Sequence, residues 1–275
     1  MTSTWLFRFA ILGAICILVL IASGSAVTAN RLEPLASASG GLFGEGGHKV
    51  ASIVASVLAM ILAIWLIAAG TETRSLGWLL AILNLALGGL GTPSLLREFP
   101  SIAILHACLA HVLFGSIVAA VVLSSPGWAK GPDRVIDAGW PSLRSLSTVA
   151  PVLVVAQIAL GAAFRHKAMG VLPHIAGAII VTLAILMMGM FVTQQCPTHR
   201  PLKSAAATMM TVVFCQVFLG IAALTERMIN STDTPAVVLV TGAHVVTGAM
   251  ALGATVALSL QIRRHVVAKP KQVEA

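Results

Sequence analysis

Histidines within apolar stretches are the residues of this sequence whose type and spacing could do chemistry. His48, His106, His174 and His244 each lie in a different apolar stretch, at roughly matching depth. An ionisable side chain inside a membrane helix needs a partner or a ligand. A hydrogen bond to a neighbouring helix would explain any one of them, but four at one depth favour a ligand.

Imidazole is the commonest side-chain metal ligand, and two imidazoles from facing helices can hold a haem iron from both sides. A zinc site is disfavoured because the sequence has neither a Cys-x-x-Cys nor a His-Glu-x-x-His run. We therefore expect two haem sites, one between His48 and His106 and the other between His174 and His244.

Two charged residues could assist the expected haem sites. Glu45 precedes His48 by three residues, which places both on one helix face, whereas the residues before His174 are MGVLP and offer no carboxylate. A carboxylate favoured by the helix dipole explains Glu45 equally well. Arg165, on the outer side, could pair with a haem propionate, although a plain exposed arginine is an equally good interpretation.

The remaining histidines carry weaker signals. His111 follows His106 by five residues, about 140° round a helix, so it cannot share the same ligand position and is interpreted as a packing residue. His199 and His265 lie on the inner side, and we expect both to be ordinary solvated residues.

Composition predicts the elements that must position these residues. The chain has 275 residues, of which 58% are hydrophobic and 9% charged, and its mean hydropathy is +0.97, a balance that excludes a soluble domain. Helix is the expected spanning structure, because backbone polar groups need internal partners in lipid. We predict eight transmembrane helices in an all-α membrane protein, at about 5–26, 47–69, 75–93, 102–124, 146–164, 171–192, 204–224 and 236–261.

Charge distribution predicts the orientation of the chain. The net charge is +8, but eleven of the 17 lysines and arginines fall on the side that holds both termini. The positive-inside rule then places the N- and C-termini in the cytoplasm, and no nucleic-acid partner is implied. The basic tail, 263–275, is expected to lie against lipid headgroups.

The chain divides into two similar halves. A proline-containing cytoplasmic linker, 126–144, separates an N-terminal four-helix half (1–125) from a C-terminal one (145–262). Gln-x-x-Leu-Gly recurs at 157–161 and 216–220, and a histidine followed by small residues opens both 174–186 and 244–258. This ordered recurrence predicts two pseudo-repeated four-helix bundles. Glycines in the spans indicate close helix packing or clearance for a flat cofactor.

These stretches resemble the heme A synthase family, membrane proteins that convert heme O to heme A for terminal oxidases. The resemblance covers nearly the whole chain and is most specific in EGGHK at 45–49 and QIALGAAFRH at 157–166; LHA at 105–107 and HVVTGA at 244–249 add to it. Unlike many members, this chain lacks a cysteine pair in the first outer loop, and Lys49 replaces the usual arginine.

The resemblance implies a function and a set of roles. Heme O would bind between His48 and His106, heme b between His174 and His244, and Glu45 would be the catalytic carboxylate beside the methyl group that is oxidised to a formyl group. A prokaryotic plasma membrane, a heme O synthase partner in cytochrome oxidase assembly, and a quinone or other electron acceptor are implied too. A non-catalytic diheme electron carrier and a haem-delivery assembly factor remain open alternatives.

Overall fold

Long apolar helices make up almost all of the structure. The computed structural model describes residues 4–32, 41–137, 139–230 and 234–268, and for residues 30–32, 42 and 268 it describes only the backbone. Eight of the described helices are long and apolar enough to cross a membrane, which confirms an all-α, multi-pass membrane protein. They are α1 (Thr4–Leu32), α2 (Glu45–Ala69), α3 (Thr71–Leu90), α5 (Pro100–Ser124), α7 (Leu143–Arg165), α8 (Leu172–Gln195), α9 (Arg200–Ile229) and α10 (Pro235–His265).

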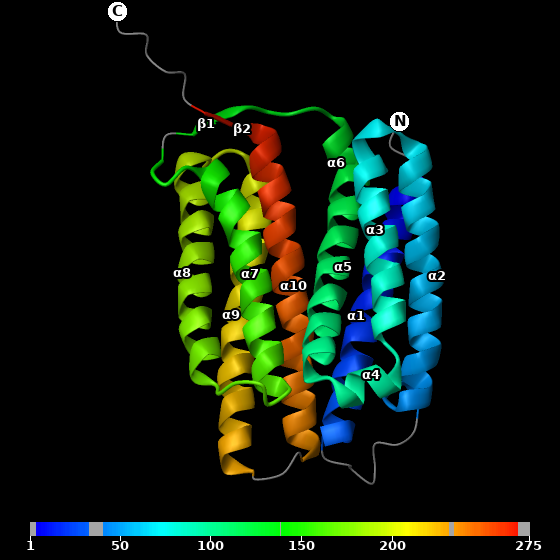
Figure 1. Cartoon of the computed structure of the whole chain (residues 1–275). Helices are drawn as coiled ribbons and strands as arrows, with labels where there is room; N and C mark the ends of the chain where they lie inside the picture. Colours follow the sequence, from blue (N-terminus) through cyan, green and yellow to red (C-terminus); the bar gives the residue numbers. More distant parts are fainter. Residues whose placement is uncertain (1–3, 33–40, 138, 231–233, 269–275) are drawn as a thin grey trace, which may run out of the picture.

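The shorter elements lie at the two ends of the bundle (Figure 1). They are the 3-10 helix η1 (Gly41–Phe43), α4 (Pro93–Glu98), α6 (Pro126–Ala129), β1 (Val135–Asp137) and β2 (Val266–Ala268). β1 and β2 pair in parallel, with Val135 opposite Val266. The linker and the residues after α10 are therefore fastened together, and α7 begins at Leu143, inside the range predicted as linker.

Local sequence sets where the helices begin and turn. Prolines stand in the first two positions of α5, α8, α9 and α10, where a missing N–H costs no helical hydrogen bond. Ser142 and Thr234 cap α7 and α10 by accepting backbone N–H groups. Gly70, with φ of +146°, makes the tight turn between α2 and α3, in a conformation that L side chains rarely adopt.

The spans form two groups, each with its own core. In the first group, α1 contacts α2, α2 contacts α3, α3 contacts α5 and α5 contacts α1; α7, α8, α9 and α10 contact one another in the same cyclic order. The groups meet along α1, α5, α7 and α10 (Figure 1). Leu62, Leu80 and Ile117 are fully buried in the first core, and Leu202 and Leu258 in the second.

Many large side chains point outward from these cores. Ile53, Ile61 and Ile64 on α2 and Ile179 and Leu183 on α8 are between 45% and 63% exposed. An apolar outer surface is what hydrocarbon requires of a spanning helix. α2, α5, α8 and α10 all begin at the end of the bundle opposite the start of α1, so the four candidate histidines lie toward that one end (Figure 1).

Candidate functional site

His174 and His244 face each other across the second group of helices. Their ring centroids are 6.2 Å apart and the ring planes are nearly perpendicular, at 88°. α8 and α10, which carry them, both contact α7 and α9. A metal held by one imidazole nitrogen on each side, at about 2 Å, leaves the two ring centroids roughly 6 Å apart. The pair is therefore spaced to accept a metal between the rings.

A glutamine of the preceding span contacts each of these imidazoles. His244 Nδ1 donates to the carbonyl of Gln216 at 3.2 Å, and its unprotonated Nε2 accepts from the Gln216 side-chain amide at 3.4 Å, a contact that a metal at Nε2 would replace. Gln157 Nε2 lies 3.0 Å from His174 Nδ1 and donates to the His174 carbonyl at 2.8 Å. With Nδ1 accepting, the His174 proton lies on Nε2, and metal binding there requires the proton to move to Nδ1 and the Gln157 amide to turn. Both glutamines come from the Gln-x-x-Leu-Gly motif, and such partners fix ring orientation.

Each of the four candidate histidines also packs against a glycine near the end of the preceding span. A Cβ on any of these glycines would lie 2.9 to 3.1 Å from the imidazole Cε1, so that the ring would have to shift to make room for it. The pairs are Gly24 with His48, Gly91 with His106, Gly161 with His174 and Gly220 with His244. The same apposition therefore occurs four times, twice in each group of helices.

The first pair of histidines sits in the N-terminal group. His48 lies in the first turn of α2, and its Nδ1 is 2.8 Å from Ser23 Oγ on α1. His106 lies in the second turn of α5, against Gly91 at the end of α3. α2 and α5 both contact α1 and α3, as α8 and α10 both contact α7 and α9. The two histidines are thus held by the helices between them in the manner of the other pair.

Glu45 is the first residue of α2, at the lip of the bundle. Its Oε1 lies 3.8 Å from the Arg97 guanidinium of α4, and the side chains of Glu45 and Arg97 are 55% and 62% exposed. An exposed ion pair of this kind stabilises a fold by less than about 1 kcal/mol. The position suits both interpretations of Glu45, as a group facing a ligand and as a carboxylate at a helix N-terminus.

Arg165 ends α7 and joins the two groups of helices. Its guanidinium donates to Ser25 Oγ at 2.8 Å and to the Ser25 carbonyl at 2.5 Å. Its charge also acts on His166, whose pKa is lowered by burial and then by this neighbouring cation. The predicted contact of Arg165 with a propionate stays a prediction; what the structure adds is its bond to α1.

The prediction for His199 and His265 is wrong. Both are buried, 5% and 6% exposed, and their rings lie 4.5 Å apart. His199 Nε2 is 3.2 Å from His265 Nδ1, and His199 Nδ1 accepts the Leu202 N–H at the start of α9. They are buried because β1 and β2 close over this end, bringing the Asp133 backbone within 2.8 Å of His265 Nδ1. His111 is buried, as a packing residue should be, with Nδ1 2.7 Å from the Ala107 carbonyl.

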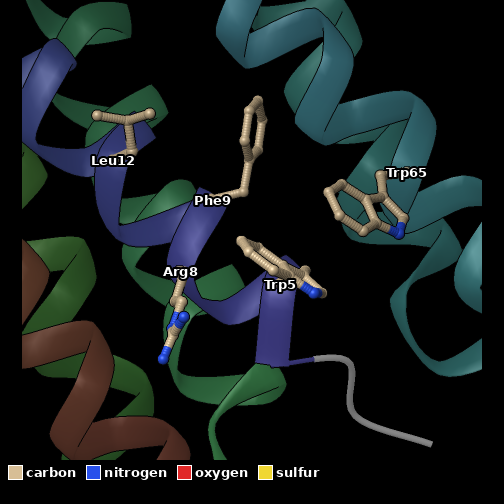
Figure 2. A pocket seen from close by; sticks show the side chains of 5 residues that line it. All are labelled: Trp5, Arg8, Phe9, Leu12 and Trp65. Atoms are coloured by element: carbon tan, nitrogen blue, oxygen red, sulfur yellow. The ribbon is translucent and has the colours of Figure 1, made fainter.

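An open hollow lies at the opposite end of the first group, far from the histidines. It encloses about 290 Å³ and is lined by four residues near the start of α1 and by Trp65 near the end of α2 (Figure 2). The four are Trp5, Arg8, Phe9 and Leu12. It contains no imidazole, and tryptophans with an arginine are typical of a membrane–water boundary. This hollow is therefore not a candidate site for chemistry that depends on the histidines.

Sequence reasoning missed several residues around the histidines. Ser23, Gly24 and Ser25 on α1 were not singled out, although a Ser-Gly-Ser run late in an apolar segment is a polar signal in its own right. Among the span glycines, for which the sequence indicates packing or cofactor clearance, Gly91, Gly161 and Gly220 each lie against an imidazole. Gly88 and Gly89 have nothing within 4 Å of a Cβ position.

Within the described part of the chain, no group of three or more His, Cys, Asp and Glu side chains is placed to hold a metal ion. A site made wholly of such protein ligands is therefore not found there, whereas a haem brings four ligand nitrogens of its own and needs only an imidazole pair. A comparison of the chain with models of protein families, with curated proteins and with solved structures finds no match.

Proposed function

We propose that this chain is a heme A synthase-like oxidoreductase, which oxidises the methyl group of heme O to a formyl group. The observation that carries the proposal is the fourfold apposition of histidine and glycine, together with the 6.2 Å spacing of His174 and His244. That spacing fits a metal between the two imidazoles, and the glycines leave no side chain to displace the rings. The donor set, two neutral imidazoles per group of helices, suits a haem iron.

In this proposal the two groups of helices are pseudo-repeated bundles with different tasks. The N-terminal bundle binds heme O through His48 and His106, and the C-terminal bundle holds heme b through His174 and His244. His174 and His244 would hold heme b, which would supply a path for electrons from the substrate side to a quinone or another acceptor. Both termini face the cytoplasm of a prokaryote, and a heme O synthase in the same plasma membrane supplies the substrate.

Glu45 is assigned the catalytic role at the first site. Conversion of a methyl to a formyl group takes one oxygen atom from water and releases four electrons and four protons in two steps, through an alcohol, and the quinone or other acceptor takes the electrons. A carboxylate at this lip can take such a proton or stabilise positive charge on the reacting carbon. Half-exposed Glu45, in the first turn of α2 with His48, can also pass the proton on to water.

The ion pair between Glu45 and Arg97 favours a second candidate function. If Glu45 serves only that pair, nothing in the first site is left to do acid–base chemistry, and the chain is a diheme electron carrier. Delivery of haem by the chain to another protein would likewise need no carboxylate.

Co-expression with a heme O source, followed by mass spectrometry of extracted haems, tests the proposal. A formyl product is expected from the wild type and from Arg97→Gln, which breaks the ion pair and keeps the carboxylate. Glu45→Gln should retain bound haem and yield no formyl product. Unmodified haem from the wild type indicates the carrier; loss of haem to an added apoprotein indicates delivery.

A further inference from the structure

Three consecutive residues near the end of α1 contact both groups of helices. Ser23 Oγ lies 2.8 Å from His48 Nδ1 of α2. A Cβ on Gly24 would lie 3.1 Å from Cε1 of the same ring. Ser25 binds Arg165 of α7. A single helical turn therefore joins a candidate ligand of the first site to a charged residue of the second group.

The Ser23 hydroxyl contacts one nitrogen of the His48 ring, Nδ1, at 2.8 Å. When the hydroxyl donates its own proton to the Leu20 carbonyl, at 3.0 Å, Oγ accepts from His48 Nδ1. His48 is then protonated on Nδ1, and Nε2 presents a lone pair, as a metal ligand must. Ser23 is fully buried, so water does not compete for this bond.

Ser25 holds the guanidinium of Arg165 through two acceptors. Its hydroxyl and carbonyl oxygens receive the two terminal nitrogens, a fork that lysine could not reproduce. Ser25 is 5% exposed, and Gly242 of α10 packs beside it, with its Cβ position 3.8 Å from Ser25 Oγ. Arg165 lies one helical turn beyond Gly161, the α7 glycine that packs against His174 of the second site.

We propose that Ser23 is a positioning residue that prepares His48 as a ligand, and that residues 23–25 of α1 fix the first site relative to the second through Arg165. The proposal rests on the proposed function only in taking the two histidine pairs as haem sites. Residues 23–25 would fix the position of one site relative to the other, because a shift of α1 would disturb both the Ser23–His48 contact and the Ser25–Arg165 contact.

The tautomer of His48 can be measured without any haem. Nitrogen-15 NMR of the full-length protein labelled in histidine, with His48→Gln to assign the signal, should show protonation on Nδ1. Ser23→Ala should remove that preference, and Ser23→Thr should restore it. Ser116→Ala is the matched control, because Ser116 is also buried and bonds only the Val112 carbonyl of its own helix. An Nε2-protonated His48 in the wild type would overturn the proposal even if haem binds.

Haem titration supplies the second readout. Ser23→Ala should weaken haem binding at the first site by about 10-fold and leave the second site unchanged, because lost partners of metal-binding histidines typically have effects of this size. Ser25→Ala, although it lies on α1, should lower the reduction potential of the haem between His174 and His244 by loosening the Arg165 cation. An unchanged haem affinity of the first site in Ser23→Ala would refute the proposed link between the sites through residues 23–25. An unchanged reduction potential of the second haem in Ser25→Ala would refute it too. A wild type that binds no haem would instead remove the proposed function while leaving the tautomer result valid.

Discussion

Two pairs of facing histidines lie at opposite ends of the C-terminal helices, and their spacing differs. The rings of His174 and His244 are 6.2 Å apart, and no hydrogen bond joins them among the described contacts. The rings of His199 and His265 are 4.5 Å apart, with nitrogens 3.2 Å from each other. The rings of His174 and His244 are far enough apart for a metal to lie between them. The rings of His199 and His265 are not, because their nitrogens are within direct hydrogen-bonding distance.

The surroundings of the two pairs agree with this difference. His174 and His244 are half-buried and lie against glycines and glutamine side chains. His199 and His265 are buried among backbone groups of Asp133 and Leu202. Histidine spacing within a helix bundle thus distinguishes a pair with room for a metal from a pair joined by a hydrogen bond, which sequence position alone does not.

Removal of one histidine from each pair should give the largest contrast. His174→Ala or His244→Ala should abolish the haem signal of the C-terminal site, because a single imidazole remains. His199→Ala should keep that signal and lower the melting temperature. Optical spectra of the purified variants after haem supplementation provide the measurement; equal haem loss in His199→Ala would abolish the distinction.

A methyl group at either glycine that packs against His174 or His244 should disturb the position of that ring strongly. Gly161→Ala and Gly220→Ala place a Cβ 2.9 Å from an imidazole Cε1, and overpacking of this kind costs about 1–3 kcal/mol. We expect weaker haem binding together with lower thermal stability. Gly88→Ala is the control, because nothing lies within 4 Å of its Cβ position. Similar behaviour of all three variants would show that the glycines do not seat the rings.

Substitutions of His199 should have a smaller effect, on thermal stability, and should distinguish its role as the N-cap of α9 from its contact with His265. His199→Ala loses the cap of α9, worth about 1 kcal/mol, as well as the contact with His265. His199→Asn can still accept the Leu202 N–H and should recover part of the stability. Thermal unfolding in detergent, followed by circular dichroism, measures both; Asn no better than Ala would show that the cap contributes nothing.

The smallest effect concerns pH at the outer end, next to Arg165. Burial and the Arg165 charge lower the pKa of His166, so the unfolded chain binds this proton more readily than the folded one. Stability is therefore complete above the unfolded pKa of about 6.5 and falls as the pH drops below it. His166→Gln should flatten the dependence of the melting temperature between pH 7 and 5 (about 6.5 being the midpoint of histidine titration). An identical slope in this variant would exclude His166 as its source.

The sequence predicted the spans because hydrophobic length is a local property, and helix ends differ by only a few residues, as for 146–164 against Leu143–Arg165. It also predicted one candidate ligand histidine in the outer half of each of α2, α5, α8 and α10. It could not predict the β1–β2 pair, whose three-residue strands lie far apart in the chain, nor the burial of His199 and His265 beneath it. The contacts of Ser23 and Ser25 could not be predicted either, because their partners belong to other helices.

The central claim is that His174 and His244 together hold a haem iron. Electron paramagnetic resonance of the purified, haem-supplemented protein tests it directly. The account predicts a low-spin ferric signal of bis-imidazole ligation that persists in His48→Ala and is lost when either His174→Ala or His244→Ala is added to that variant. A colourless protein, or a bis-imidazole signal that survives either C-terminal variant unchanged in the His48→Ala background, would contradict it.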